Sequence, residues 1–226
     1  MDLLNLTKII AAFITIIFSL TVGIRVFTLN TKNWLNRWFA LFFASGSLGF
    51  FFYTIYHLIT NNASIIIPLM ITAQLFFNFI CISLLMTVLI IEKYEKVAMS
   101  FKYIASVIVL FIIMSIGYFI WPPELDQSSY ASEIVNTETS IGLLLFVNIS
   151  RIIICILVVY RYVLISLKLE GDHKKRIQWF YIGIIIVVLG LFINLLGGFL
   201  NSIAIEIIAL IAIDIGSIVV FKGFLI

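Results

Sequence analysis

The chain has 226 residues, of which 63% are hydrophobic and only 11% are charged, and its mean hydropathy is +1.23. Soluble domains average about half apolar and about a quarter charged residues, so this composition excludes an ordinary water-soluble protein. The apolar residues form continuous runs of about 20 residues, which is the length of a membrane-spanning helix rather than of a barrel strand. We therefore expect an integral membrane protein, with no room between the runs for a separate soluble catalytic domain.

The apolar runs predict seven transmembrane helices. In chain order the predicted spans are Leu6–Phe27, Trp38–Leu58, Ser64–Ile91, Tyr103–Trp121, Thr139–Val163, Ile177–Leu200 and Ile203–Phe221. The first span lacks a basic leader and is too long for a secretory signal, so we interpret it as a helix of the mature protein. The fourth is followed by Pro122 and Pro123, which end a helix because proline lacks the backbone N–H. These prolines open the longest predicted outer loop, Pro122–Glu138.

Lysine and arginine residues predict the orientation, since cytoplasmic connections carry an excess of them. Twelve of the 14 lie in the first, third and fifth connections or near the C-terminus. These twelve are Arg25, Lys32, Arg37, Lys93, Lys96, Lys102, Arg161, Lys168, Lys174, Lys175, Arg176 and Lys222. The opposite side has only Lys8, and its longest loop holds Glu124, Asp126, Glu133 and Glu138 without a basic residue. The sequence therefore predicts a multi-pass protein of the cell membrane with the N-terminus outside and the C-terminus in the cytoplasm.

The second and sixth spans share a spacing that suggests an internal repeat. A Trp-Phe pair opens each of them, at Trp38 and at Trp179, and a Leu-Gly pair ends at Gly49 and at Gly190, eleven residues after each tryptophan. Equal spacing favours a three-plus-one-plus-three plan, in which two three-helix halves run parallel. Coincidence is the alternative, because tryptophan is common at the ends of transmembrane helices.

Two charged residues stand near the middle of predicted spans, where an unpaired charge costs several kcal/mol. Arg151 lies about 12 residues into the fifth span from the outer side, and Asp214 about 11 residues into the seventh. At about 1.5 Å per residue, both lie roughly 16–18 Å deep. Matched depth and opposite charge predict an ion pair between these helices, which would be either a ligand or switching site or a packing contact. Removing Asp214 should then partly rescue an Arg151→Ala variant.

Further polar residues of the spans share this zone of the membrane. They are Gln74 and Asn78 on the third span, Asn148 on the fifth, Asn194 on the sixth and Glu206 on the seventh. With Arg151 and Asp214 they predict a polar core that binds a ligand or switches between states. The alternative is that each amide only hydrogen-bonds between helices as a packing contact.

Several kinds of site are not expected from this sequence. No cysteine and histidine residues have the spacing of metal ligands, and no P-loop or nucleophile elbow is present. The lysine that carries retinal in microbial rhodopsins follows an aspartate by one turn, whereas Ile218 follows Asp214 here. We therefore expect no cofactor and no metal. The basic residues are explained by membrane topology, so no nucleic-acid partner is expected either.

Five short segments indicate a family. Asn36-Arg37-Trp38-Phe39 enters the second span, and Leu89-Ile90-Ile91-Glu92-Lys93-Tyr94 leaves the third. His173-Lys174-Lys175-Arg176 enters the sixth span, which carries Asn194 and Gly197-Gly198, and Val219-Val220-Phe221-Lys222-Gly223-Phe224-Leu225 closes the last. In these marks the chain resembles the N-terminal seven-helix sensor region of membrane histidine kinases. The resemblance implies a domain that senses an external or membrane signal and passes it to a cytoplasmic kinase.

The kinases continue into an output domain, whereas this chain stops at Ile226. We therefore expect signal output to need a partner protein, or the chain to be a piece of a longer one. The prediction as a whole is an all-α seven-helix bundle in the lipid bilayer, without enzymatic activity, acting as a receptor-like sensory domain. A small-molecule ligand, a cytoplasmic signalling protein and a second copy forming a homodimer are the candidate partners. A small-solute transporter or channel and an assembly subunit of a membrane complex are the alternatives.

Overall fold

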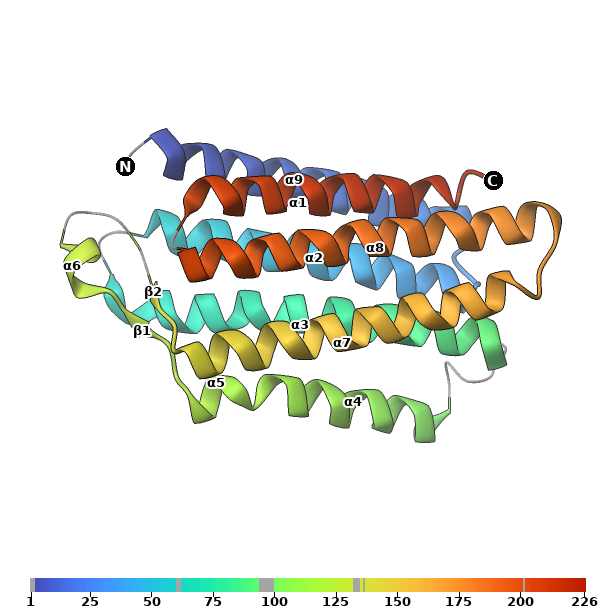
Figure 1. The fold of residues 1–226 in the computed structure, drawn as a ribbon, viewed down its shortest axis with the longest axis horizontal. Coiled ribbons are helices and arrows are strands. Elements are labelled where there is room, and N and C mark those ends of the chain that lie inside the picture. Colours follow the sequence, from blue (N-terminus) through green and yellow to red (C-terminus); the bar gives the residue numbers. More distant parts are fainter. Residues whose placement is uncertain (1–2, 60–61, 94–99, 132–134, 136, 201) are drawn as a thin grey trace.

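The computed structural model describes residues 3–59, 62–93, 100–131, 135, 137–200 and 202–226 (Figure 1). Within these residues, seven helical segments are long and apolar enough to cross a membrane. They are α1 (Leu3–Leu29), α2 (Trp34–Leu58), α3 (Ala63–Lys93), α4 (Phe101–Ser115) with α5 (Gly117–Ile120), α7 (Ile141–Ser166), α8 (Gly171–Leu200) and α9 (Ile203–Lys222). The predicted all-α seven-helix bundle is thus confirmed. The predicted positions Tyr94, Lys96 and Glu133 lie outside the described residues.

Most helices are longer than the apolar runs that predicted them. The clearest case is α8, which begins at Gly171 although its apolar run begins at Ile177. Its first turns are polar and charged, and they stay helical because backbone hydrogen bonds form equally well outside the apolar layer. The fourth span is divided at Ile116, between α4 and α5. There Gly117 packs so closely on Phe146 that an added Cβ would lie 2.6 Å from its ring.

The helices form two rows, which Figure 1 shows from the side. One row is α1, α2 and α3 in that order, and the other is α9, α8 and α7, so that α1 contacts α9 and α3 contacts α7. The remaining span, α4, packs against α3 and α7 at one edge. Two parallel three-helix halves related by a two-fold axis along the bundle would have these neighbours. The arrangement therefore suits the internal repeat, which itself stays a prediction.

The two ends of the bundle differ in charge. We call the end at which α1 begins the N-terminal end and the end at which α9 finishes the C-terminal end (Figure 1). The α1–α2, α3–α4 and α7–α8 connections all lie at the C-terminal end, so the described basic residues predicted to share one side do so. Large apolar side chains cover the outside of the bundle, and Phe13, Ile112 and Ile153 are each more than half exposed. Such a surface belongs in lipid rather than water, so the chain is a multi-pass membrane protein.

Glycines bring α8 and α9 into close contact. Gly183, Gly190 and Gly197 recur every seven residues on α8, and all three are buried against α9. A Cβ added to Gly183 would lie 2.6 Å from the carbonyl oxygen of Gly216, so the two backbones touch at this level. Small residues permit this approach in membranes, where van der Waals packing rather than the hydrophobic effect holds helices together.

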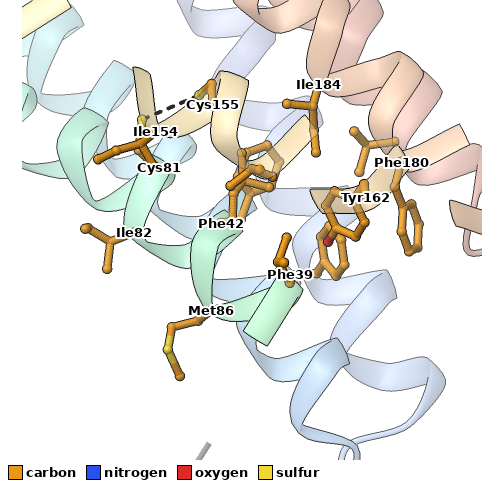
Figure 2. Close-up of a cluster of buried hydrophobic side chains, with 14 of the residues drawn as sticks. Phe39, Phe42, Cys81, Ile82, Met86, Ile154, Cys155, Tyr162, Phe180 and Ile184 are labelled. Carbon is orange, nitrogen blue, oxygen red and sulfur yellow. Dashed lines mark hydrogen bonds between the residues drawn. The ribbon is translucent and has the colours of Figure 1, made fainter. Parts of the chain in front are cut away.

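An aromatic cluster fills the C-terminal half of the bundle. Figure 2 shows Phe39, Tyr162 and Phe180 converging from α2, α7 and α8. The ring centroids of Phe39 and Phe180 are 4.7 Å apart, and Phe224 closes the group at 4.9 Å from Phe180. Phe39, Tyr162 and Phe180 are all fully buried. Side chains therefore fill the C-terminal half of the bundle.

The long connection between α5 and α7 has structure of its own. It contains β1 (Glu124–Leu125), the short helix α6 (Gln127–Tyr130) and β2 (Thr137–Glu138), and the two strands pair antiparallel. Val135 is buried among Tyr56, Ile66 and Met70 of α2 and α3. The connection thus covers part of the N-terminal end, where the sequence had predicted only a loop.

Candidate functional site: a polar cavity at the N-terminal end

A cavity of about 340 Å³ lies between the two rows of helices. Residues from α1, α2, α3, α5, α7, α8, α9 and β2 line it. Apolar side chains such as Met70, Phe77, Leu144 and Leu210 form much of its wall. This volume is at the lower end of the range for small-molecule sites, which are mostly apolar with a few placed polar groups. The cavity is therefore large enough for a small organic ligand.

Arg151 of α7 stands at the inner part of this cavity and is buried. Its Nε donates a hydrogen bond of 2.8 Å to Oδ1 of Asn78 on α3. Its Nη2 donates to the backbone oxygen of Gln74 at 3.0 Å and to the side-chain Oε1 of the same residue at 2.9 Å. The residues Gln74 and Asn78, one turn apart on α3, therefore hold the guanidinium in a fixed orientation. The predicted grouping of these three residues is observed.

A second layer supports this arrangement. Asn78 is fully buried and donates from its Nδ2 to the backbone oxygen of Met114 and to the hydroxyl of Ser115, both at 3.3 Å. The hydroxyl of Tyr118 donates to Oε1 of Gln74, also at 3.3 Å. The fourth span thus orients the α3 side chains that in turn orient Arg151.

The acceptors of Arg151 are all neutral amides. Among the described residues, no carboxylate lies within ion-pair distance of Arg151. The guanidinium stays protonated under any condition that proteins meet, and an unpaired charge in a membrane interior is costly. The site therefore presents a buried positive charge to the cavity.

Lys8 and Glu206 form an ion pair nearer the N-terminal end. Lys8 of α1 and Glu206 of α9 both line the cavity, and their side chains are mostly buried. The ammonium also lies 5.4 Å from the ring centroid of Tyr53, on the aromatic face. This pair joins the first and last helices and leaves the outer part of the cavity electrically balanced.

The predicted ion pair between Arg151 and Asp214 is not formed. Oδ2 of Asp214 instead accepts a hydrogen bond of 2.9 Å from the hydroxyl of Thr15 on α1. Its other oxygen, Oδ1, is buried and has no hydrogen-bond partner among the described residues. The physical reason is the helix order: α8 lies between α7 and α9, so two charges at equal depth face different neighbours (Figure 1). Asp214 does not line the cavity that contains Arg151.

The remaining predicted residues divide between the cavity and the packing around it. Asn148, one turn before Arg151, lines the cavity and donates to the backbone oxygen of Leu144 at 2.9 Å. Asn194 of α8 also lines the cavity, although its side chain is exposed. Asn78 supports Arg151 from behind without lining the cavity. The predicted polar core thus exists, with Glu206 in it and Asp214 outside it.

The lining residues that were not predicted as part of the site include Lys8, Tyr53, Tyr56 and His57. Lys8 had a usable signal, since it is the one basic residue that the positive-inside pattern leaves on the outer side. The other three occur within one helical turn of each other, which places polar aromatic groups together near the end of α2. His57 is half-buried, and its Nδ1 lies 2.8 Å from the backbone oxygen of Tyr53.

Within the part of the chain that the structure describes, no group of three or more His, Cys, Asp or Glu residues is placed to hold a metal ion. Comparison with protein-family models, with curated proteins and with solved structures finds no match for this chain. The fold and the cavity therefore define the class of protein: a seven-helix, multi-pass membrane protein with a charged internal cavity.

Proposed function

We propose that the chain is a receptor-like sensory domain that binds a small molecule in the cavity and signals to a cytoplasmic partner. The observation that carries this proposal is the contrast between the two halves of the bundle. The N-terminal half holds a cavity of about 340 Å³, whereas fully buried Phe39, Tyr162 and Phe180 fill the C-terminal half. A cavity in one half of the bundle and a packed core in the other suit a receptor better than a channel. The predicted orientation would turn the cavity outwards.

A seam of contacts between α3 and α7 supports the signalling part of the proposal. Below the Arg151 contacts, the sulfur atoms of Cys81 and Cys155 lie 3.8 Å apart (Figure 2). Further on, the hydroxyls of Thr87 and Tyr162 are 2.6 Å apart. At the C-terminal end, Arg161 makes a two-pronged ion pair with Glu92, with both N···O distances 2.6 Å.

The seam therefore runs from the cavity to the C-terminal end of the bundle. A ligand that changes the position of Arg151 would act on α3 and α7, which contact each other at three further places along the seam. The resemblance to the sensor region of membrane histidine kinases supports a kinase, or another cytoplasmic signalling protein, as the partner. The surface we propose for this contact is basic: it consists of Lys168 in the connection between α7 and α8 and of Lys174 and Lys175 in the first turns of α8.

The test has two arms on the purified protein. A thermal-shift screen of small metabolites should yield ligands that raise the unfolding temperature, because a ligand that binds only the folded state stabilises it. Val147→Phe, which fills the cavity, should abolish the shift, whereas Ile153→Phe on the outer face of the same helix should keep it. In proteoliposomes the same ligands should not cross the membrane. Ligand flux would instead support the transporter alternative, and equal shifts in both variants would reject the cavity as the site.

A further inference from the structure

The charges that line the cavity indicate what it binds. Three residues that line the cavity carry a full charge, and they are Lys8, Arg151 and Glu206. The half-buried His57 also lines the cavity. Lys8 and Glu206 neutralise each other as an ion pair. Arg151 therefore leaves the cavity with one positive charge that no carboxylate balances among the described residues. In surroundings of low dielectric constant, such a charge attracts an anion strongly.

We infer that the cavity binds an organic anion whose acidic group, in the simplest case a carboxylate, contacts the guanidinium of Arg151. The inference rests on the proposed binding function and adds the chemical class of the ligand to it. A guanidinium donates charge-assisted hydrogen bonds to carboxylate oxygens, which are stronger than those between neutral groups. Nη1 makes none of the hydrogen bonds that Nε and Nη2 donate to Asn78 and Gln74, so these two residues leave it available to a ligand.

The guanidinium is held in position before any ligand arrives. Asn78 and Gln74 fix it from α3, and the backbone of Met114 and the hydroxyl of Tyr118 fix those two amides in turn. A binding group that is already oriented loses little conformational entropy on binding, which raises affinity. Only a neutral network could do this and still leave the positive charge available, since a carboxylate partner would cancel it.

The depth of the charged groups sets the length of the ligand. Arg151 follows the N-cap residue Ser140 of α7 by 11 residues, and Glu206 follows Ser202 of α9 by four. At about 1.5 Å per residue, the Lys8–Glu206 pair lies roughly 10 Å closer than Arg151 to the N-terminal end of the bundle. Apolar side chains, Phe77 among them, line the cavity. The ligand is therefore amphipathic and about 10 Å long, with its acid group innermost.

The experiment compares unbranched carboxylates from butanoate to octanoate with their neutral amides, on the full chain in uncharged detergent. The carboxylates should raise the unfolding temperature, most strongly near the matching length, and the amides should not. Arg151→Gln should weaken carboxylate binding at least about tenfold, as expected for a lost charge-assisted contact. Arg151→Lys should bind with intermediate affinity because it keeps the charge but not the planar, fixed guanidinium.

A second measurement needs no variant and so does not depend on how Arg151→Gln folds. Phenylglyoxal modifies arginine side chains, and mass spectrometry reports the modification of each one. Octanoate should protect Arg151 and octanamide should not, while the exposed Arg25 should react equally in both cases. In nanodiscs, protection by anionic phosphatidylglycerol without added acid would assign the anion to a lipid head group, and protection by octanoate alone would assign it to a soluble acid.

The inference is overturned if amides and carboxylates bind equally, or if no carboxylate and no anionic lipid protects Arg151. Binding of amides that is lost in Val147→Phe would overturn the anion assignment while leaving the cavity as a ligand site. The failure of the inference is thus distinct from the failure of the proposed function.

Discussion

The contact between α8 and α9 makes a stability prediction whose size follows from the structure. In Gly183→Ala the new Cβ would lie 2.6 Å from the carbonyl oxygen of Gly216 and from the backbone nitrogen of Val220. Ordinary contacts begin near 3.4 Å, so the helices must separate by about 1 Å at a point where backbone faces backbone. Overpacking of this kind costs about 1–3 kcal/mol. Alanine returns about 0.5–1 kcal/mol through its better helix propensity, so a net loss of stability is expected.

Gly198→Ala on the same helix is the matched control. Its new Cβ would lie no closer than 3.6 Å to any atom, the nearest being a methyl group of Leu144, so only the gain in helix propensity applies. The two variants should therefore differ in the free energy of unfolding by about 1–3 kcal/mol. Thermal unfolding in detergent, followed by the fluorescence of the four tryptophans, of which Trp179 lies on α8, measures this difference. If Gly183→Ala is as stable as Gly198→Ala, the two backbones are not in contact and the reasoning fails.

Three further predictions concern the interior. Mild oxidation of the folded protein should join Cys81 to Cys155, which lowers the mass by about 2 Da as two thiols become a disulfide. If both thiols persist under an oxidant that reaches the cavity, the two sulfur atoms are not in the 3.8 Å contact. Arg151→Gln and Asp214→Asn should change the free energy of unfolding additively, within about 0.5 kcal/mol, because the two residues share no partner among the described residues. If each substitution instead offsets the loss caused by the other in a thermal unfolding assay of the double variant, Arg151 and Asp214 do form the ion pair predicted from the sequence. Tyr162→Phe should cost about 1 kcal/mol in the same assay, since it removes a buried hydroxyl that bonds to α3; an unchanged unfolding temperature would argue against that bond.

Features that depend on local composition could be predicted from the sequence. Each span was located because about 20 consecutive apolar residues are stable only in lipid, and a helix there satisfies its own backbone hydrogen bonds. The division of lysine and arginine between the two ends followed in the same way, since it depends only on where each span begins and ends. These properties need no knowledge of which helices are neighbours.

The partners of Arg151 and Asp214 depend on helix neighbours. Depth along a helix can be counted in the sequence, and both charges do lie in the middle parts of their helices, α7 and α9. Which way each charge faces depends on helix order, and here α8 separates α7 from α9. Arg151 therefore contacts Gln74 and Asn78 on α3, while Asp214 contacts Thr15 on α1.

The cavity is likewise a product of the tertiary structure. Lys8, Tyr53 and Glu206 are far apart in the chain, and only the closing of the two rows brings them to one wall. The close approach at Gly183 is visible in sequence only as a seven-residue glycine spacing, whose meaning depends on α9 lying opposite. Composition and hydropathy by themselves determined that this protein is a seven-helix membrane bundle, because the solvent acts on each segment separately. Tertiary packing decided that the positive charge of Arg151 lies at a cavity, because pairing and burial arise only between segments.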